Sequence, residues 1–290
     1  MNLVGQNIFI TGATSGIGKV AALKLANDGA TVIATYRNDE KGETLLQNFK
    51  DNHPNSKGKL ELIKCNLSSF ESISEACKKV KNNYDKLDAI INNAGIMNFS
   101  LIESENKIEE IFHVNLLAPV LISHLLINSL EKSDLGKLIF TTSGLHQGKI
   151  NFNNIELKIN FSGFKSYSQT KLGLILLTKL FAINLSKSNI GVYSNHPGLV
   201  RTDIARTAGI FSKLFFYLMG KSPLEGAKTL IYLSENENRF LKSGEYYADC
   251  KIAETSKESY NIETATNLLN VCKTYLINWI SYPSAIFPNS

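Results

Sequence analysis

A glycine-rich segment, Thr11-Gly12-Ala13-Thr14-Ser15-Gly16-Ile17-Gly18, separates the apolar stretch Asn7–Ile10 from a helical pattern over about 17–28. Its glycines have the spacing G-x-x-x-G-x-G. Glycines let the backbone approach a pyrophosphate closely, and the start of the following helix offers free N–H groups and the positive end of its dipole. The segment therefore predicts a dinucleotide-binding turn. Taken alone, it also fits an ordinary strand–turn–helix connection.

Apolar runs of strand length alternate with helix-length segments along the chain. Strands are predicted near 7–10, 31–36, 60–66, 87–92, 137–143, 190–195 and 245–250, and helices near 17–28, 40–50, 71–82, 107–130, 166–188, 224–234 and 262–280. This alternation gives a parallel sheet with helices on both faces. We see no linker or repeat. We therefore predict one α/β domain over residues 1–290, with a doubly wound parallel sheet of about seven strands.

Composition narrows the function classes. The 290 residues carry 31 Lys and Arg against 26 Asp and Glu, a net charge of +5, and the basic residues are spread along the chain. We therefore expect no nucleic-acid partner. The four cysteines lack metal-ligand spacing, so no metal site is predicted. No signal-peptide pattern and no run of about 18 apolar residues is seen, which favours a cytoplasmic protein.

The end of the second predicted strand favours NADP(H) over NAD(H). An NAD site usually places an acidic residue there to hold the ribose hydroxyls. Here the sequence is Thr35-Tyr36-Arg37-Asn38, with no carboxylate. The Arg37 guanidinium suits a phosphate and can stack on adenine, and Ser15 offers a further hydroxyl. The alternative is that Arg37 is a solvated surface charge.

Tyr167 and Lys171 are four residues apart in a predicted helix and so share one helix face. A neighbouring ammonium favours the phenolate and lowers the pKa of a tyrosine from about 10. The pair thus predicts a general acid/base near neutral pH. Tyr and Lys are common residues, so the spacing taken alone also fits a surface pair.

Other polar residues lie where a parallel sheet binds ligands. Ser143 ends the fifth predicted strand and Asn92-Asn93-Ala94-Gly95 ends the fourth, both at the carboxyl edge. The Ser143 hydroxyl could donate to a substrate carbonyl. Asn115 lies inside a predicted helix, where an amide is a poor helix former. It either satisfies a local backbone group or holds a water or backbone geometry for proton relay.

Together, these motifs resemble the short-chain dehydrogenase/reductase family, which has a Rossmann fold. The resemblance covers roughly residues 5–275 and rests on Thr11–Gly18, Asn92–Gly95, Asn115, Ser143, Tyr167–Lys171 and His196–Thr202, in the family's order. It implies that Tyr167 exchanges a proton with the carbonyl or alcohol oxygen, while Lys171 lowers the pKa of Tyr167 and binds the nicotinamide ribose. It implies that Ser143 orients the substrate and that Asn115 supports a water-mediated relay.

The same resemblance implies a set of cofactor contacts, namely Gly12, Thr14, Ser15, Gly16, Ile17, Gly18, Arg37, Asn66, Leu67, Asn93, Ala94, Gly95, Tyr167, Lys171, Pro197, Gly198, Val200 and Thr202. Asn66 stands where the family usually has an aspartate that holds adenine, so an altered adenine contact is expected.

The segment Ser243–Lys251 and the separation of Ser143 from Tyr167 resemble the retinol dehydrogenase-like branch. Members of that branch mostly prefer NADP(H) and act on retinoids or other lipophilic carbonyls. Residues 203–222 fall where the family builds a substrate lid, and they are strongly apolar, which favours a lipophilic substrate and allows contact with a membrane surface. The apolar stretch Leu172–Leu185 suits burial against the sheet or in a homodimer.

The sequence therefore predicts an NADP(H)-dependent oxidoreductase that interconverts a lipophilic carbonyl, such as a retinal-like aldehyde or ketone, and its alcohol. One alternative is a steroid or xenobiotic carbonyl reductase. Another is a non-catalytic NADP(H)-binding sensor or interaction protein that has kept the fold.

Overall fold

The computed structural model describes residues 2–200, 221–280 and 282–287 and contains one sheet in the order β3-β2-β1-β4-β5-β6-β7-β8. The strands are β1 (Asn7–Ile10), β2 (Thr31–Tyr36), β3 (Lys59–Lys64), β4 (Ala89–Asn92), β5 (Lys137–Thr141), β6 (Gly191–His196), β7 (Tyr246–Ala248) and β8 (Lys251–Ile252). All neighbouring pairs are parallel except β7 and β8. The predicted doubly wound sheet is confirmed, but with eight strands rather than about seven, because β8 is a two-residue edge strand too short to leave a sequence pattern.

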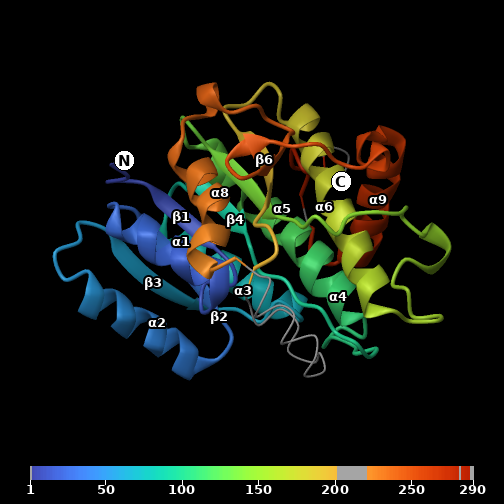
Figure 1. The fold of residues 1–290 in the computed structure, drawn as a ribbon, viewed down its shortest axis with the longest axis horizontal. Coiled ribbons are helices and arrows are strands. Elements are labelled where there is room, and N and C mark those ends of the chain that lie inside the picture. The colour runs from blue at the N-terminus through green and yellow to red at the C-terminus, as the bar shows by residue number, and fades with distance from the viewer. Residues whose placement is uncertain (1, 201–220, 281, 288–290) are drawn as a thin grey trace.

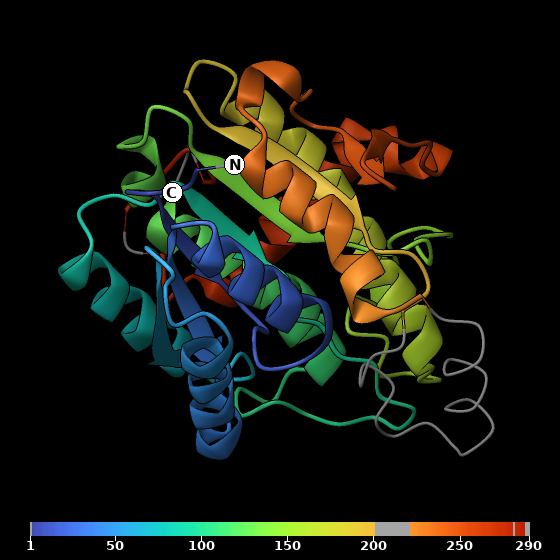
Figure 2. The same ribbon diagram turned by 60° about the vertical axis from the view of Figure 1, so that its left-hand side comes forward.

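Helices cover both faces of the sheet (Figures 1 and 2). One face carries α1 (Gly16–Asn27), α2 (Asp39–Asn52) and α8 (Pro223–Glu235). The other carries α3 (Phe70–Asn83), α5 (Ala118–Glu131) and α6 (Gly163–Asn184), with α9 (Ile262–Leu276) packed on α6. The apolar stretch Leu172–Leu185, expected to be buried against the sheet or in a homodimer, lies mostly in α6. Helix α9 of the same chain covers part of this stretch.

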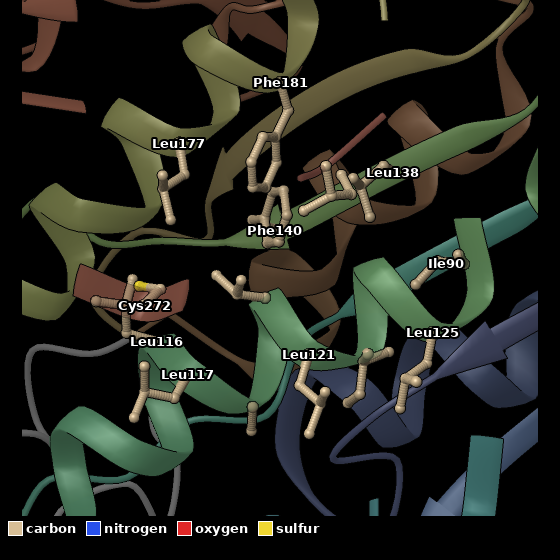
Figure 3. Close-up of a cluster of buried hydrophobic side chains, with 14 of the residues drawn as sticks. Ile90, Leu116, Leu117, Leu121, Leu125, Leu138, Phe140, Leu177, Phe181 and Cys272 are labelled. Carbon is tan, nitrogen blue, oxygen red and sulfur yellow. The ribbon is translucent and has the colours of Figure 1, made fainter. Parts of the chain in front are cut away.

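The strands are buried because their side chains alternate between two apolar layers. In β5, Leu138 and Phe140 face α5 and α6, whereas Ile139 faces the opposite layer with α1 and α8. Figure 3 shows the first layer, where Phe140 of β5 and Phe181 of α6 lie close together, with their ring centroids 6.2 Å apart. This packing fixes the position of α5 and α6 relative to the strands. It thereby positions Tyr167 and Lys171, which lie on α6.

The single helix predicted over 107–130 is wrong in detail. The chain forms a short α4 (Glu110–Phe112), then a π-helical turn, His113–Leu117, and only then α5, with Pro119 in its first turn. Proline lacks an N–H, so it fits the start of α5 without leaving a donor unpaired. Among the described residues, Glu110–Glu131 is the one helical stretch long and apolar enough to cross a membrane, and 94% of its most apolar window is buried inside the fold.

Candidate active site

The carboxyl edge of the sheet opens into a pocket of about 610 Å³. Nearly all of the predicted site residues line it: Gly12, Thr14, Ser15, Gly16, Ile17, Gly18, Arg37, Asn66, Leu67, Asn93, Ala94, Gly95, Ser143, Tyr167, Lys171, Pro197, Gly198 and Val200. Asn115 lies behind its wall, and Thr202 falls outside the described residues. The volume lies in the range of small-molecule sites.

The glycine-rich turn is packed so closely that side chains would not fit. A Cβ on Gly12 would lie 2.8 Å from the Cα of Ala94, and a Cβ on Gly18 would lie 2.2 Å from the carbonyl oxygen of Gly12. Gly12 and Gly16 have φ values of +68° and +55°, in the left-handed region that favours glycine. The turn therefore brings bare backbone to the pocket.

Helix α1 begins at this turn without a side-chain cap. Ser15 is its N-cap residue but makes no capping hydrogen bond, whereas α2, α3, α6, α8 and α9 are each capped by a side chain. The first-turn N–H groups of α1 are thus left for another acceptor, beside the positive end of the helix dipole. An uncapped helix start next to a glycine cradle fits a dinucleotide pyrophosphate.

Thr11 and Asn93 tie the glycine-rich turn to the end of β4. The Thr11 hydroxyl accepts from the N–H groups of Asn93 and Ala94, both at 3.1 Å. The Asn93 amide donates to the carbonyl oxygens of Thr11 and Gly12 at 3.0 and 3.3 Å. Asn93 therefore shapes the predicted cofactor groove by holding backbone.

Two predicted adenine-end residues differ in what surrounds them. Arg37 is exposed at the pocket wall after β2, and it makes no ion pair within the described part of the chain. Asn66, in contrast, is already engaged, because its Nδ2 donates to Glu105 at 2.7 Å and its Oδ1 accepts from the Ser68 hydroxyl at 2.9 Å. Arg37 is free to meet a phosphate, whereas the Asn66 side chain has protein partners at both ends.

Tyr167 and Lys171 lie at the inner end of the pocket, on the first half of α6. The Lys171 Nζ donates to the carbonyl oxygen of Thr141 at 2.9 Å and lies 5.4 Å from the centroid of the Tyr167 ring. Both residues are almost fully buried, since Lys171 is 1% exposed and Tyr167 is 6% exposed. The ammonium thus sits over the ring face and is anchored to the last residue of β5.

Burial dominates the ionisation of both groups. It lowers the pKa of Lys171 to about 8 and raises the pKa of Tyr167 to about 12, while the Ser143 hydroxyl lowers the pKa of Tyr167 in part. For Tyr167 this direction is opposite to the one predicted from its spacing to Lys171. Because Lys171 is directed at Thr141 and Tyr167 is desolvated, the phenol stays protonated at neutral pH, which is the form a proton donor needs.

Asn115 lies in the middle of the π-helical turn and holds a backbone segment 19 residues away. Its Oδ1 accepts from the N–H of Ile96 at 2.8 Å and its Nδ2 donates to the Ile96 carbonyl at 2.9 Å. A Cβ on Gly95 would lie 3.2 Å from the Lys171 Nζ and 3.5 Å from the Asn115 Oδ1, so all three residues converge. Asn115 thus satisfies the backbone of Ile96, and its part in a proton relay stays a prediction; π-turns often mark functional sites.

Ser143 follows β5 by two residues and is half-buried at the pocket wall. Its hydroxyl accepts from the N–H of Leu145 at 3.1 Å and also interacts with the Tyr167 phenol. The two hydroxyls therefore lie in the wall of the same pocket and interact with each other. A carbonyl oxygen placed there would meet two donors, as oxyanion stabilisation requires.

Sequence reasoning missed several lining residues, namely Ile96, Met97, Asn98, Glu110, Val114, Leu145, His196 and Leu199. Most are apolar and carry no motif. Glu110 is the one charged residue among them, and its Oε2 accepts from the Asn98 amide at 2.8 Å. His196 belongs to the quoted motif His196–Thr202, and that position was the available signal.

The predicted lid, 203–222, lies outside the described residues except for Lys221 and Ser222. The described ends of this segment are paired with each other, since Val200 bridges to Lys221 and the Lys221 N–H donates to the Leu199 carbonyl at 2.7 Å. Leu199 and Val200 line the pocket, and Lys221 is paired with them, so the described residues that flank the segment lie at the pocket wall.

Comparisons with known proteins agree with this geometry. A family model described as short chain dehydrogenase matches residues 6–210. Retinol dehydrogenases 14 and 11 of Mus musculus are 31% and 32% identical over 282 and 274 residues, covering 92% and 93% of this chain and 84% and 86% of theirs.

Solved structures show the same fold. A Mycobacterium paratuberculosis protein has a TM-score of 0.76 at 22% identity, covering 94% of each chain. A short chain dehydrogenase of Escherichia coli CFT073 complexed with NADPH has a TM-score of 0.67 at 22% identity, covering 86% of this chain and 98% of its own. The chain therefore belongs to the short-chain dehydrogenase/reductase family of oxidoreductases, in its retinol dehydrogenase-like branch.

Proposed function

We propose that this protein is an NADP(H)-dependent oxidoreductase that interconverts a lipophilic carbonyl compound and its alcohol. The observation that carries the proposal is the layout of one pocket. Tyr167, Lys171 and Ser143 lie at one end, and the uncapped start of α1 and Arg37 lie at the other. A dinucleotide bound along this groove would have its phosphates at α1 and its reactive ring beside the phenol.

The preference for NADP(H) rests on charge at the end of β2. Arg37 lies on the pocket wall as an exposed guanidinium, and Ser15 lines the pocket on the α1 side. Thr35 and Tyr36 complete this end of the groove and bring no carboxylate. A 2′-phosphate gains a charge-assisted hydrogen bond from the guanidinium, whereas a bare ribose hydroxyl gains little.

Bound NADPH supplies the hydride in this proposal, and the chain supplies position and the proton. The hydroxyls of Ser143 and Tyr167 hold the carbonyl oxygen of the substrate. Tyr167 gives its phenolic proton to that oxygen, which becomes the alcohol oxygen, and the phenolate is left facing Lys171. Because burial raises the pKa of Tyr167 to about 12, the proton is present throughout the neutral range.

The lipophilic substrate class follows from the lining around Tyr167. Met97 and Ile96 pack with Tyr167, and Val114, Leu145 and Leu199 add apolar surface to the same pocket. The retinol dehydrogenases among the relatives carry a lipophilic alcohol in their name. An apolar pocket gains free energy by removing such a compound from water.

The test is steady-state oxidation of NADPH against a panel of lipophilic carbonyls that includes all-trans-retinal. NADH and the Tyr167→Phe variant are run in parallel. We expect turnover that prefers NADPH and falls by about 10²–10⁴-fold in Tyr167→Phe, with the NADPH Kd unchanged. Undiminished turnover in Tyr167→Phe would refute the assigned proton donor. NADPH binding without turnover of any carbonyl would instead favour the sensor alternative.

A further inference from the structure

Two histidines hold the turn that carries the catalytic serine, residues 143–146, called here the serine turn. The first is His196, the last residue of β6. Its Nδ1 accepts from the N–H of Gly144 at 3.0 Å and from the N–H of Gly198 at 3.3 Å. One ring nitrogen thus joins the serine turn to the loop after β6, which lines the pocket through Pro197 and Gly198.

Packing against Gly144 reinforces these hydrogen bonds. A Cβ on Gly144 would lie 3.1 Å from the Nε2 of His196 and 3.3 Å from its Cε1. The imidazole therefore lies directly against the backbone next to Ser143. A displacement of the ring would move the serine turn with it.

The second histidine, His146, belongs to the serine turn and is 4% exposed. Its Nδ1 lies 2.8 Å from the carbonyl oxygen of Ser143, and its Nε2 accepts from the N–H of Ser256 at 3.2 Å. A carbonyl oxygen only accepts, so the proton of His146 lies on Nδ1. This ring ties the backbone of Ser143 to the segment that precedes α9.

Tyr246, the first residue of β7, contacts both rings. Its ring is stacked on His196 with centroids 6.1 Å apart at 15°, and it lies 5.4 Å from the ring of His146. Tyr246 is 3% exposed and tightly packed. Neither imidazole ring can therefore rotate into the space of Tyr246 without disrupting the packing of β7.

We propose that His196 is a positioning residue for the reaction: it holds Ser143 in the geometry that the carbonyl oxygen requires, with His146 as its counterpart on the other side of the serine turn. Because the Nδ1 of His196 faces two N–H donors, it must stay unprotonated, so the proton of that ring lies on Nε2. The two neighbouring imidazoles are therefore neutral and in opposite tautomers.

This inference rests on the proposed carbonyl chemistry for its kinetic part only. Losing the acceptor at position 196 frees Gly144 and shifts the Ser143 hydroxyl, and a misplacement of about 1 Å costs up to about 10²-fold in rate. Among the predicted cofactor contacts His196 holds only Gly198, whereas the glycine-rich turn and Arg37 make no hydrogen bond with it in the described part of the chain, so the Kd for NADPH should change much less than kcat.

The kinetic test compares four variants by kcat, NADPH Kd and Tm. His196→Leu removes the acceptor, and His196→Asn restores an oxygen at the place of Nδ1. His196→Gln carries the same amide one bond further out. His53→Leu is the control. His53 directly follows α2, packs on Phe49 of that helix and does not line the active-site pocket.

We expect His196→Leu and His196→Gln to lose about tenfold or more in kcat, with the Kd within about twofold of the wild type. His196→Asn should keep kcat within about threefold, and His53→Leu should match the wild type. Full kcat in His196→Leu, or an equal loss in His196→Asn and His196→Leu at matched Tm, would overturn the positioning role.

A second measurement is independent of turnover. Long-range proton–nitrogen NMR spectra of the wild-type protein labelled with ¹⁵N-histidine report which ring nitrogen carries the proton. We expect the Nε2–H form for His196 and the Nδ1–H form for His146 at pH 7. A protonated Nδ1 on His196 would overturn the inference. If no carbonyl is turned over, the proposed function fails, but the spectra still decide whether the two-histidine arrangement exists.

Discussion

The Lys171 ammonium donates to the carbonyl oxygen of Thr141 at 2.9 Å, which ties α6 to the end of β5 beside the face of the Tyr167 ring. Among the described residues, no carboxylate forms an ion pair with Lys171. The charge is therefore stabilised by a peptide dipole and by the face of the Tyr167 ring, in a site that is almost closed to water. That setting makes Lys171 the group in the pocket whose charge changes nearest to neutral pH.

Reduction should weaken as pH rises through about 8. Burial lowers the pKa of Lys171 to about 8, so its positive charge is present below that pH and is lost above it. The charge stabilises the phenolate that Tyr167 becomes on giving up its proton. A profile of kcat/KM for carbonyl reduction from pH 6 to 10 should show one descending limb near 8. A profile that stays flat to pH 10 would contradict the role of Lys171.

Arg37→Ala should separate the two nicotinamide cofactors. The variant loses the guanidinium at the end of β2, so the Kd for NADPH should rise by about 10–100-fold, equal to about 1.4–2.8 kcal/mol. The Kd for NADH should change by less than about threefold. Titration calorimetry with both cofactors measures the difference directly. Equal changes for NADPH and NADH would remove the phosphate contact from the proposal.

Glu110→Gln should change which substrates are accepted. Glu110 brings a carboxylate to the pocket, where the Asn98 amide donates to it at 2.8 Å, and its neighbour in the chain, Ile111, packs with Tyr167. A like charge on a substrate is repelled there, since two charges in a partly buried site interact strongly. The variant should raise kcat/KM for lipophilic carbonyls that carry a carboxylate by several-fold. Neutral carbonyls serve as the control and should change little; a uniform change for both would argue against charge discrimination.

Much of the site could be predicted from the sequence because its residues lie in short motifs at strand ends. The alternation of strands and helices predicts that the ends of β1, β4 and β5 meet at one edge, and thus that Gly12, Asn93 and Ser143 converge. Local spacing also predicts that Tyr167 and Lys171 share a helix face. These inferences need only backbone periodicity and the rule that parallel sheets bind ligands at their carboxyl edge.

The remainder depends on tertiary contacts that no local pattern encodes. The raised pKa of Tyr167 comes from its burial, which spacing along a helix does not reveal. The π-helical turn at Asn115 arises where its amide pairs with Ile96, a residue of another segment. His196 meets Gly144 only because β5 and β6 are neighbours in the sheet.

Stability should fall as pH drops from about 6.5 to about 4, in part through His113. This ring is fully buried in the π-helical turn, its Nδ1 lies 2.8 Å from the Ser104 hydroxyl, and its Nε2 has no partner within the described part of the chain. Burial lowers the pKa of His113 from 6.5 to about 4. Between those values the unfolded chain binds more protons than the folded one, so the free energy of unfolding decreases as pH falls, by up to about 3 kcal/mol from this ring.

His113→Asn tests this directly, because asparagine can still pair with Ser104 but does not titrate. The smaller side chain leaves a cavity, and its cost is the same at every pH. The variant should therefore be less stable than the wild type at pH 7, and the gap should narrow as pH falls towards 4. Urea unfolding at half-unit pH steps gives both curves. Parallel curves, with a constant gap from pH 7 to 4, would mean that His113 takes up its proton equally well in the folded and unfolded chains.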